Sequence, residues 1–217
     1  ILGIIEGITE FLPISSTGHL IVTSSLLQIP TSEFLKTFEI AIQLGAVLSI
    51  AWLYHKKLKQ NPTLLLFACI GFLPAAFIGA IFHTKIKILL GSTATVGWSL
   101  LIGGVCLLLL EAWLSQREQP QRTLADLQYK DALIIGILQT LALIPGVSRA
   151  AATITGGLLL RFTRQQATEF SFILSLPTIA GATAFDLLSM PSLPSKNEWL
   201  LLGVGCMTAF LFATISI

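Results

Sequence analysis

The sequence holds near its start a stretch rich in polar side chains, Glu6-Gly7-Ile8-Thr9-Glu10-Phe11-Leu12-Pro13-Ile14-Ser15-Ser16-Thr17-Gly18-His19. This stretch contains two carboxylates, four hydroxyls and an imidazole, in a chain in which 11% of residues are charged. Ionisable groups at membrane depth cost free energy and usually serve a function. We therefore expect this stretch to organise both the fold and the functional site.

The composition predicts an all-α polytopic membrane protein. Of the 217 residues, 54% are hydrophobic, and the mean hydropathy is +0.84. Soluble domains contain about 25% charged residues, far more than this chain does. The net charge of +2 is small, and we expect no nucleic-acid partner. The three cysteines lie singly in apolar runs, which is typical of small core residues rather than of a disulfide or metal framework.

Five apolar stretches are long enough to cross a bilayer, which takes about 20 helical residues. They are residues 38–54, 64–82, 94–114, 170–190 and 199–217. Two further apolar regions, 1–27 and 132–160, are interrupted by Pro13 and Gly18 and by Pro145-Gly146. Because each half is too short to span and polar residues cluster at the breaks, we predict two re-entrant helical hairpins. The alternative in each region is one long helix kinked at proline.

The two interrupted regions resemble each other. Gly3-Ile4-Ile5-Glu6 pairs with Gly136-Ile137-Leu138-Gln139, and Pro13-Ile14-Ser15-Ser16 pairs with Pro145-Gly146-Val147-Ser148 after a one-residue gap. We predict a single membrane domain, 1–217, with repeat one at 1–115 and repeat two at 130–217. A hairpin followed by three spans places the second copy upside down, as an inverted-topology repeat. The last span of repeat two is missing, so we expect the chain to be part of a longer protein.

The loop charges predict the orientation, because cytoplasmic loops carry an excess of Lys and Arg. We therefore expect the cytoplasmic face to be the face with more Lys and Arg. It would carry Lys56, Lys57, Lys59, Arg117, Arg122, Lys130, Arg161 and Arg164, against Lys36, Lys85, Lys87 and Lys196 on the outer face. The hairpin tips would then meet near the midplane. The remaining basic residue, Arg149, lies at the second tip.

The hairpin tips have the chemistry of an anion site. Ser15-Ser16 and Ser148 each precede a half-helix and are natural N-caps, and a helix N-terminus attracts phosphate. Arg149 between two such termini can bond two phosphate oxygens at once. The alternative is a purely structural ion pair between Arg149 and an acidic residue, Glu6, Glu10 or Glu39.

The carboxylates of Glu6 and Glu10 lie four residues apart on one helix face. Beside a phosphate they require either a divalent cation or a retained proton on one of them. His19 follows Ser16 by three residues, so the pair has the pattern of a nucleophile and a base, although a capping serine with a structural histidine fits equally. Ser15 and Thr17 are further candidate phosphate contacts.

Several polar residues on the spans are candidates for a supporting layer around this site. Gln139 occupies the place of Glu6 in the repeat. Asp186 is close to the outer end of its span, where it could also be simply solvated. The full set is Glu39, Gln43, Gln139, Ser171 and Asp186.

Two function classes follow from these residues. A membrane-embedded phosphatase acting on a lipid phosphate would use the hydroxyl, the imidazole and the carboxylates together. A secondary transporter or flippase for an anionic or phosphorylated lipid would use the inverted repeat and the anion clamp. The sequence favours the enzyme, because a transporter does not need all these groups at one tip.

The first motif, residues 6–19, resembles the signature of the undecaprenyl pyrophosphate phosphatases, the bacitracin-resistance family. The second motif, Pro145-Gly146-Val147-Ser148-Arg149-Ala150-Ala151-Ala152-Thr153, is similar to that family's Pro-Gly-x-Ser-Arg-Ser-Gly-x-Thr. The resemblance covers nearly the whole chain in order. Ala150 and Ala151 depart from the family's Ser-Gly, so a hydroxyl at position 150 cannot be required here.

The resemblance implies an enzyme that removes one phosphate from a C55 polyprenyl diphosphate and so recycles the lipid carrier of cell-wall synthesis. It implies a divalent cation, Mg²⁺ or Ca²⁺, and a fold of six spans with two re-entrant hairpins. Our own hypothesis is that Glu10, together with Glu6, either holds this cation or acts as the base. The resemblance places the protein in the bacterial plasma (inner) membrane, with the active site open to the outer face, and makes a homodimer plausible. The motif positions carried over are Glu6, Glu10, Ser16 and His19 for catalysis and Ser148, Arg149 and Thr153 for gripping the diphosphate.

Overall fold

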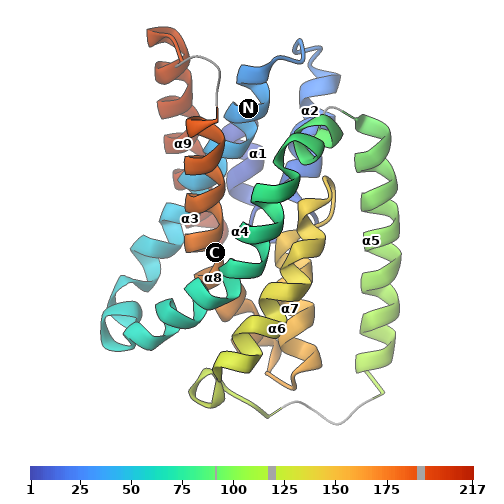
Figure 1. The fold of residues 1–217 in the computed structure, drawn as a ribbon, viewed down its shortest axis with the longest axis vertical. Helices are drawn as coiled ribbons and strands as arrows, with labels where there is room; N and C mark the ends of the chain where they lie inside the picture. The colour runs from blue at the N-terminus through green and yellow to red at the C-terminus, as the bar shows by residue number, and fades with distance from the viewer. Residues whose placement is uncertain (91, 117–120, 190–193) are drawn as a thin grey trace.

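The computed structural model describes residues 1–90, 92–116, 121–189 and 194–217, with the backbone alone at position 87 (Figure 1). Within these ranges the regular structure is helical, apart from one isolated bridge between Arg122 and Phe162. The helices are α1 (Leu2–Thr9), α2 (Ser16–Leu26), α3 (Glu33–Gln60), α4 (Pro62–Leu90), α5 (Thr93–Leu114), η1 (Leu124–Asp126), α6 (Tyr129–Gln139), η2 (Thr140–Leu143), α7 (Arg149–Leu159), α8 (Arg164–Leu188) and α9 (Lys196–Ser216).

Five of these helices, α3, α4, α5, α8 and α9, are long and apolar enough to cross a membrane. They coincide with the five predicted spans, which confirms an all-α multi-pass membrane protein. Helix α3 is longer than predicted, because Ser32 caps it at Leu35 N and the lysines of its last turn suit the negative end of the helix dipole. Predicted positions Arg117 and Met190 lie outside the described residues.

The two interrupted regions form pairs of short helices rather than one kinked helix each. Helices α1 and α2 contain 8 and 11 residues, and α6 and α7 contain 11 each. Within each pair the two helices contact one another. The short helix η2 extends the break before α7. The chain therefore turns back at both breaks, as a hairpin requires, while the re-entrant placement in the bilayer stays a prediction.

Each first half-helix crosses a span of the other repeat at paired glycines. A Cβ on Gly3 in α1 would lie 2.7 Å from the carbonyl oxygen of Gly205 in α9. A Cβ on Gly136 in α6 would lie 2.2 Å from the carbonyl oxygen of Gly71 in α4. Small residues allow such close backbone approach between helices in membranes. Each repeat thus packs its first short helix on a span of the other repeat. The inverted orientation of the repeats remains a prediction.

Among the described residues, three ion pairs lie at one end of the molecule. Arg122 pairs with Asp131 at 2.6 Å, Arg164 pairs with Glu111 at 2.7 Å, and Lys57 pairs with Glu169. The ion pairs that Lys57 and Glu111 make link the C-terminal ends of α3 and α5 to the N-terminal end of α8, and Arg122 links the loop before η1 to the start of α6, all at the lower end in Figure 1. They belong to the face that the charge pattern assigns to the cytoplasm.

Candidate functional site

In each hairpin, one serine caps the N-terminus of the second helix. Ser15 caps α2 by accepting a hydrogen bond from Gly18 N at 3.2 Å, and Ser148 caps α7 by accepting one from Ala151 N at 3.1 Å. The predicted capping is therefore present at both tips. In the structure, the N-cap Ser15 is therefore equivalent to the N-cap Ser148. The sequence comparison had paired Ser148 with Ser16 instead, which is a shift of one residue. The first helical residues, Ser16 and Arg149, consequently occupy equivalent places.

The hairpin tips meet through Glu10. Arg149 donates from Nη2 to Glu10 Oε1 at 2.7 Å, and from Nη1 to the carbonyl oxygen of Ser171 at 3.3 Å. The hydroxyl of Ser16 donates to Glu10 Oε2. Glu10 and Ser16 are buried, so the carboxylate joins a cation from one hairpin to a hydroxyl from the other at a place shielded from water.

Glu6 lies beside Glu10 and Ser16 and is 0% exposed. Neither of its carboxylate oxygens has a hydrogen-bond partner among the described residues. Buried acceptors of this kind require an explanation, such as a bound ion or a retained proton. The sequence prediction that Glu6 and Glu10 form one acidic pair therefore has a geometric basis.

His19 does not contact the hydroxyl of Ser16. Its Nδ1 donates instead to the carbonyl oxygen of Ser15 at 2.8 Å. The side chain that accepts a hydrogen bond from Ser16 is Glu10, because the turn after α1 brings this carboxylate next to the start of α2. The structure thus places a different base at the candidate nucleophile from the one that the sequence spacing indicated.

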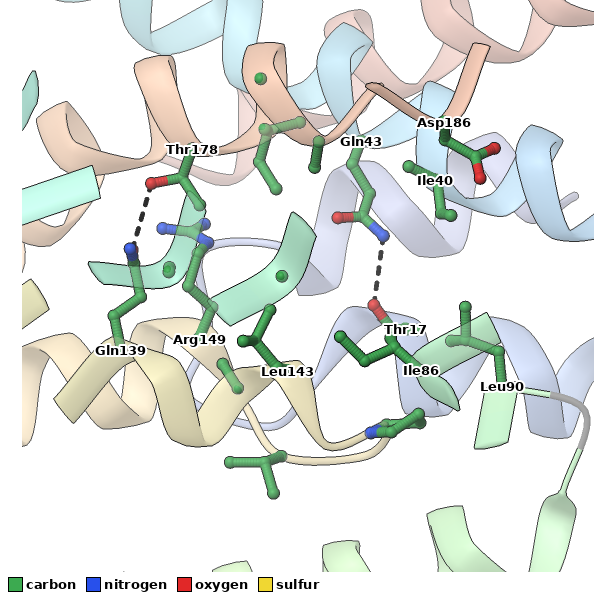
Figure 2. Close-up of a pocket in the computed structure, with 18 of the residues that line it drawn as sticks. Thr17, Ile40, Gln43, Ile86, Leu90, Gln139, Leu143, Arg149, Thr178 and Asp186 are labelled. Carbon is green, nitrogen blue, oxygen red and sulfur yellow. Dashed lines mark hydrogen bonds between the residues drawn. The ribbon is translucent and has the colours of Figure 1, made fainter. Parts of the chain in front are cut away.

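A cavity of about 450 Å³ opens beside the two tips. Figure 2 shows Arg149 in this cavity, with Gln139 and Thr178 to one side and Thr17 and Gln43 to the other. Gln43 donates to Thr17 at 3.1 Å, and Thr178 donates to Gln139 at 3.2 Å. Glu10, Ser15, Ser16 and Ser148 also line the cavity, and the rest of its wall is mainly apolar.

Asp186 also lines the cavity and is 2% exposed, so the alternative of a solvated residue is wrong. It accepts a hydrogen bond from Thr37 at 2.6 Å, and its Oδ1 lies 3.5 Å from His83 Nε2. The helices α3, α4 and α8 meet there, which the position of Asp186 near a span end did not reveal. The sequence reasoning missed His83 and Thr178, although a lone histidine in an apolar helix is a usable signal.

Five predicted residues do not line the cavity, namely Glu6, His19, Thr153, Ser171 and Glu39. Thr153 and Ser171 bond each other at 2.6 Å, and Thr153 also donates to the carbonyl oxygen of Arg149 at 2.9 Å. They join α7 to α8 behind Arg149. Glu39 accepts a hydrogen bond from Ser24 at 2.6 Å and links α3 to α2. These residues support the site from behind its wall.

The fold and the cavity together define a polytopic α-helical membrane protein with a buried polar site, built where two broken helices meet. The family model described as "Bacitracin resistance protein BacA" matches residues 1–217. The chain belongs to this family, as its two motifs indicated.

Curated relatives agree over the full length of the chain. A protein of Bdellovibrio bacteriovorus is 45% identical over 217 residues, which are 100% of this chain and 82% of the relative. Proteins of Wolinella succinogenes and Campylobacter jejuni are 43% and 44% identical, and the matches cover 84% and 81% of their lengths and 100% of this chain. All three carry the name undecaprenyl-diphosphatase.

Proposed function

We propose that this protein hydrolyses undecaprenyl diphosphate to undecaprenyl phosphate and inorganic phosphate. The observation that carries the proposal is the contact of Arg149 with Glu10, which in turn holds the hydroxyl of Ser16. The names of the relatives and the family support the same activity. The product is the lipid carrier of cell-wall synthesis, and its recycling accounts for bacitracin resistance. The transporter alternative is not favoured.

Substrate binding falls to the second hairpin. Arg149 is the cation that faces the cavity at the tip, and a guanidinium binds phosphate oxygens in pairs. Ser148 offers its hydroxyl proton, because its oxygen already serves as the cap of α7. Ser15 and Thr17 approach from the first hairpin. Thr153 acts indirectly, by holding the backbone of Arg149.

The chemistry falls to the first hairpin. Ser16 Oγ attacks the terminal phosphorus, the bond from this phosphorus to the bridging oxygen breaks, and lipid monophosphate leaves. Glu10 takes the hydroxyl proton, since it already accepts the hydrogen bond of Ser16. Water then releases phosphate from the serine. His19 is a positioning residue that ties its ring to the start of α2.

The residues present fit the divalent cation that the family implies. Glu6 contributes two buried oxygens without hydrogen-bond partners, and Glu10 lies beside it. Mg²⁺ and Ca²⁺ prefer such hard oxygen ligands and often complete their coordination with substrate phosphates. In the part of the chain that the structure describes, no cluster of three or more metal-ligating side chains occurs, so phosphate oxygens would complete the site. The bound cation would neutralise charge between carboxylates and phosphate.

The orientation belongs to the same proposal. The cavity runs along α4 to Ile86 and Leu90, at the end of the helix that carries Lys85. The excess of Lys and Arg at the opposite end supports the proposal that this is the outer face of the bacterial plasma membrane. The prenyl tail would leave the apolar cavity wall towards the lipid. A homodimer remains part of the proposal for the intact protein.

The direct test is phosphate release from C55 polyprenyl diphosphate by the purified protein in detergent. Hydrolysis needs no sealed membrane, whereas transport does. A pure, folded sample that releases no phosphate would rule out the enzyme. Acid quenching during turnover, followed by mass spectrometry, should find phosphate on Ser16. Full activity without that adduct would replace the serine attack by a water molecule that Ser16 orients.

A further inference from the structure

Two buried nitrogen donors in the cavity have no partner among the described residues, Gln139 Nε2 and Arg149 Nε. Gln139 is 1% exposed, and both residues line the cavity. A buried donor without an acceptor costs about 1–3 kcal/mol, so proteins rarely keep one without a reason. Two such donors in one cavity point to an acceptor that both can share.

The protein's own carboxylates do not provide this acceptor. Glu10 faces other groups, the Nη2 atom of Arg149 and the hydroxyl of Ser16. Asp186 is held at the far end of the cavity, by Thr37 and near His83 (Figure 2). Both residues that carry the open donors line the cavity, so a ligand that fills it would lie next to these donors.

Gln139 is held so that its amide nitrogen stays available. Its Oε1 accepts a hydrogen bond from Thr178, which fixes the side chain on the α8 side of the cavity. The nitrogen atom is then left for another partner. In the repeat, this position is that of Glu6, whose orphaned atoms are acceptors instead.

We propose that Gln139 Nε2 and Arg149 Nε together bind one phosphate group of the substrate, which makes Gln139 a substrate-binding residue. The inference rests on the proposed function and adds to it a neutral donor beside the arginine. A neutral amide adds a hydrogen bond to phosphate without another buried charge, whereas a carboxylate of the same shape would repel it.

The test compares Gln139→Leu and Gln139→Glu with the wild type and with Gln60→Leu, a matched change at the exposed end of α3. For a polyprenyl diphosphate in detergent, Gln139→Leu should raise KM about tenfold to a hundredfold, because hydrogen bonds to charged groups are the stronger ones. Gln139→Glu should raise KM further. Without substrate, Gln139→Leu should melt no lower than the wild type, since it removes an unpaired buried donor and since Thr178 keeps its hydrogen bond to the carbonyl oxygen of Leu174 at 2.8 Å.

A purely structural role gives the opposite pattern, with a lower melting temperature and an unchanged KM, and would overturn the inference. An unchanged KM for Gln139→Glu would also overturn it, because the open atom would then act as an acceptor.

A second arm does not depend on turnover. Inorganic phosphate should raise the melting temperature of the wild type and of Gln60→Leu, and this rise should be lost in Gln139→Leu. Wild-type protein that binds phosphate in this way but releases none from the lipid would contradict the proposed function and leave the anion site standing. An equal rise in Gln139→Leu and the wild type would contradict the anion site alone. Separate titrations with inorganic phosphate and with polyprenyl monophosphate then distinguish the terminal phosphate from the lipid-linked one.

Discussion

The first and second hairpins share a shape and differ in the polar side chains that they place at their tips. In both, a serine caps an 11-residue helix that begins at the next residue. That next residue is Ser16 in α2 and Arg149 in α7. The first helix of each hairpin differs as well, since Glu6 in α1 carries two acceptors without partners and Gln139 in α6 carries a donor without a partner. The comparison teaches that one backbone design presents unpartnered acceptors in one hairpin and an unpartnered donor beside an arginine in the other.

The largest loss of both stability and activity should come from Arg149→Met. The substitution leaves Glu10 buried without its cation, which costs about 3–5 kcal/mol of stability. It also removes the phosphate grip, so phosphate release should fall by about 10³-fold or more. The double variant Glu10→Gln with Arg149→Met should regain most of the melting temperature and none of the activity. A wild-type melting temperature for Arg149→Met alone would show that this ion pair does not hold the tips together.

Substitutions of Ser16 and Ser148 should affect different kinetic constants. Ser16→Ala should lower kcat about 10³-fold with little change in melting temperature, because its hydroxyl is the proposed nucleophile. Ser148→Ala should remove a helix cap worth about 1 kcal/mol and act on KM more than on kcat. Steady-state kinetics and thermal melting of both variants check this split. Equal losses of kcat would mean that the two hairpins do not divide the chemistry as proposed.

Substitution by alanine should destabilise the protein at both glycine crossings, but to different extents. Gly136→Ala would drive a Cβ to 2.2 Å from a backbone oxygen, against 2.7 Å for Gly3→Ala. Overpacking of this kind costs about 1–3 kcal/mol, and Gly136→Ala should cost more. Gly103→Ala is the control, because nothing lies within 4 Å of its Cβ, and it should stabilise α5 by up to about 1 kcal/mol. Melting in detergent gives the order, and a more stable Gly136→Ala would contradict the close crossing.

The smallest effect should come from the loop that leads into the second hairpin. The backbone N–H and the hydroxyl of Thr123 lower the pKa of the exposed Asp126 carboxyl. A lowered folded-state pKa stabilises the folded loop above the unfolded value of about 3.9, and this stabilisation is lost as the pH falls through the lower folded value. The protection factor of the Thr123 amide, which is the intrinsic exchange rate at the same pH divided by the measured rate, should therefore fall on acidification in the wild type, and it should be low at every pH in Asp126→Ala. Exchange that is equally slow in both proteins would exclude the cap.

Much of the architecture could be predicted because its causes are local. Apolar length marks the five spans, and Pro13 and Pro145 mark the breaks. The place of Arg149 near acidic residues followed from the high cost of an unpaired buried charge. Ser15 and Ser148 followed from the capping preference of serine.

The remaining features depend on three-dimensional contacts that no local pattern contains. The spacing of His19 after Ser16 is typical of neighbours on one helix face, yet the turn that positions Glu10 decides which base meets the hydroxyl. Asp186 lies near a span end, but its burial depends on α3 and α4 packing over it. The pairing of Thr153 with Ser171 joins two helices whose faces the sequence did not specify.

The long sequence separation of the central ion pair has a consequence for biosynthesis. Glu10 and Arg149 are 139 residues apart, so the ribosome takes roughly 7 to 28 s between them at typical elongation speeds of about 5–20 residues per second. Throughout that interval the carboxylate has no guanidinium, and burying it alone in lipid would be costly. The amino-terminal hairpin therefore has to wait, in water or beside the insertion machinery, until its counterpart has been translated. Assembly of the catalytic centre is then a late event in the life of the nascent chain.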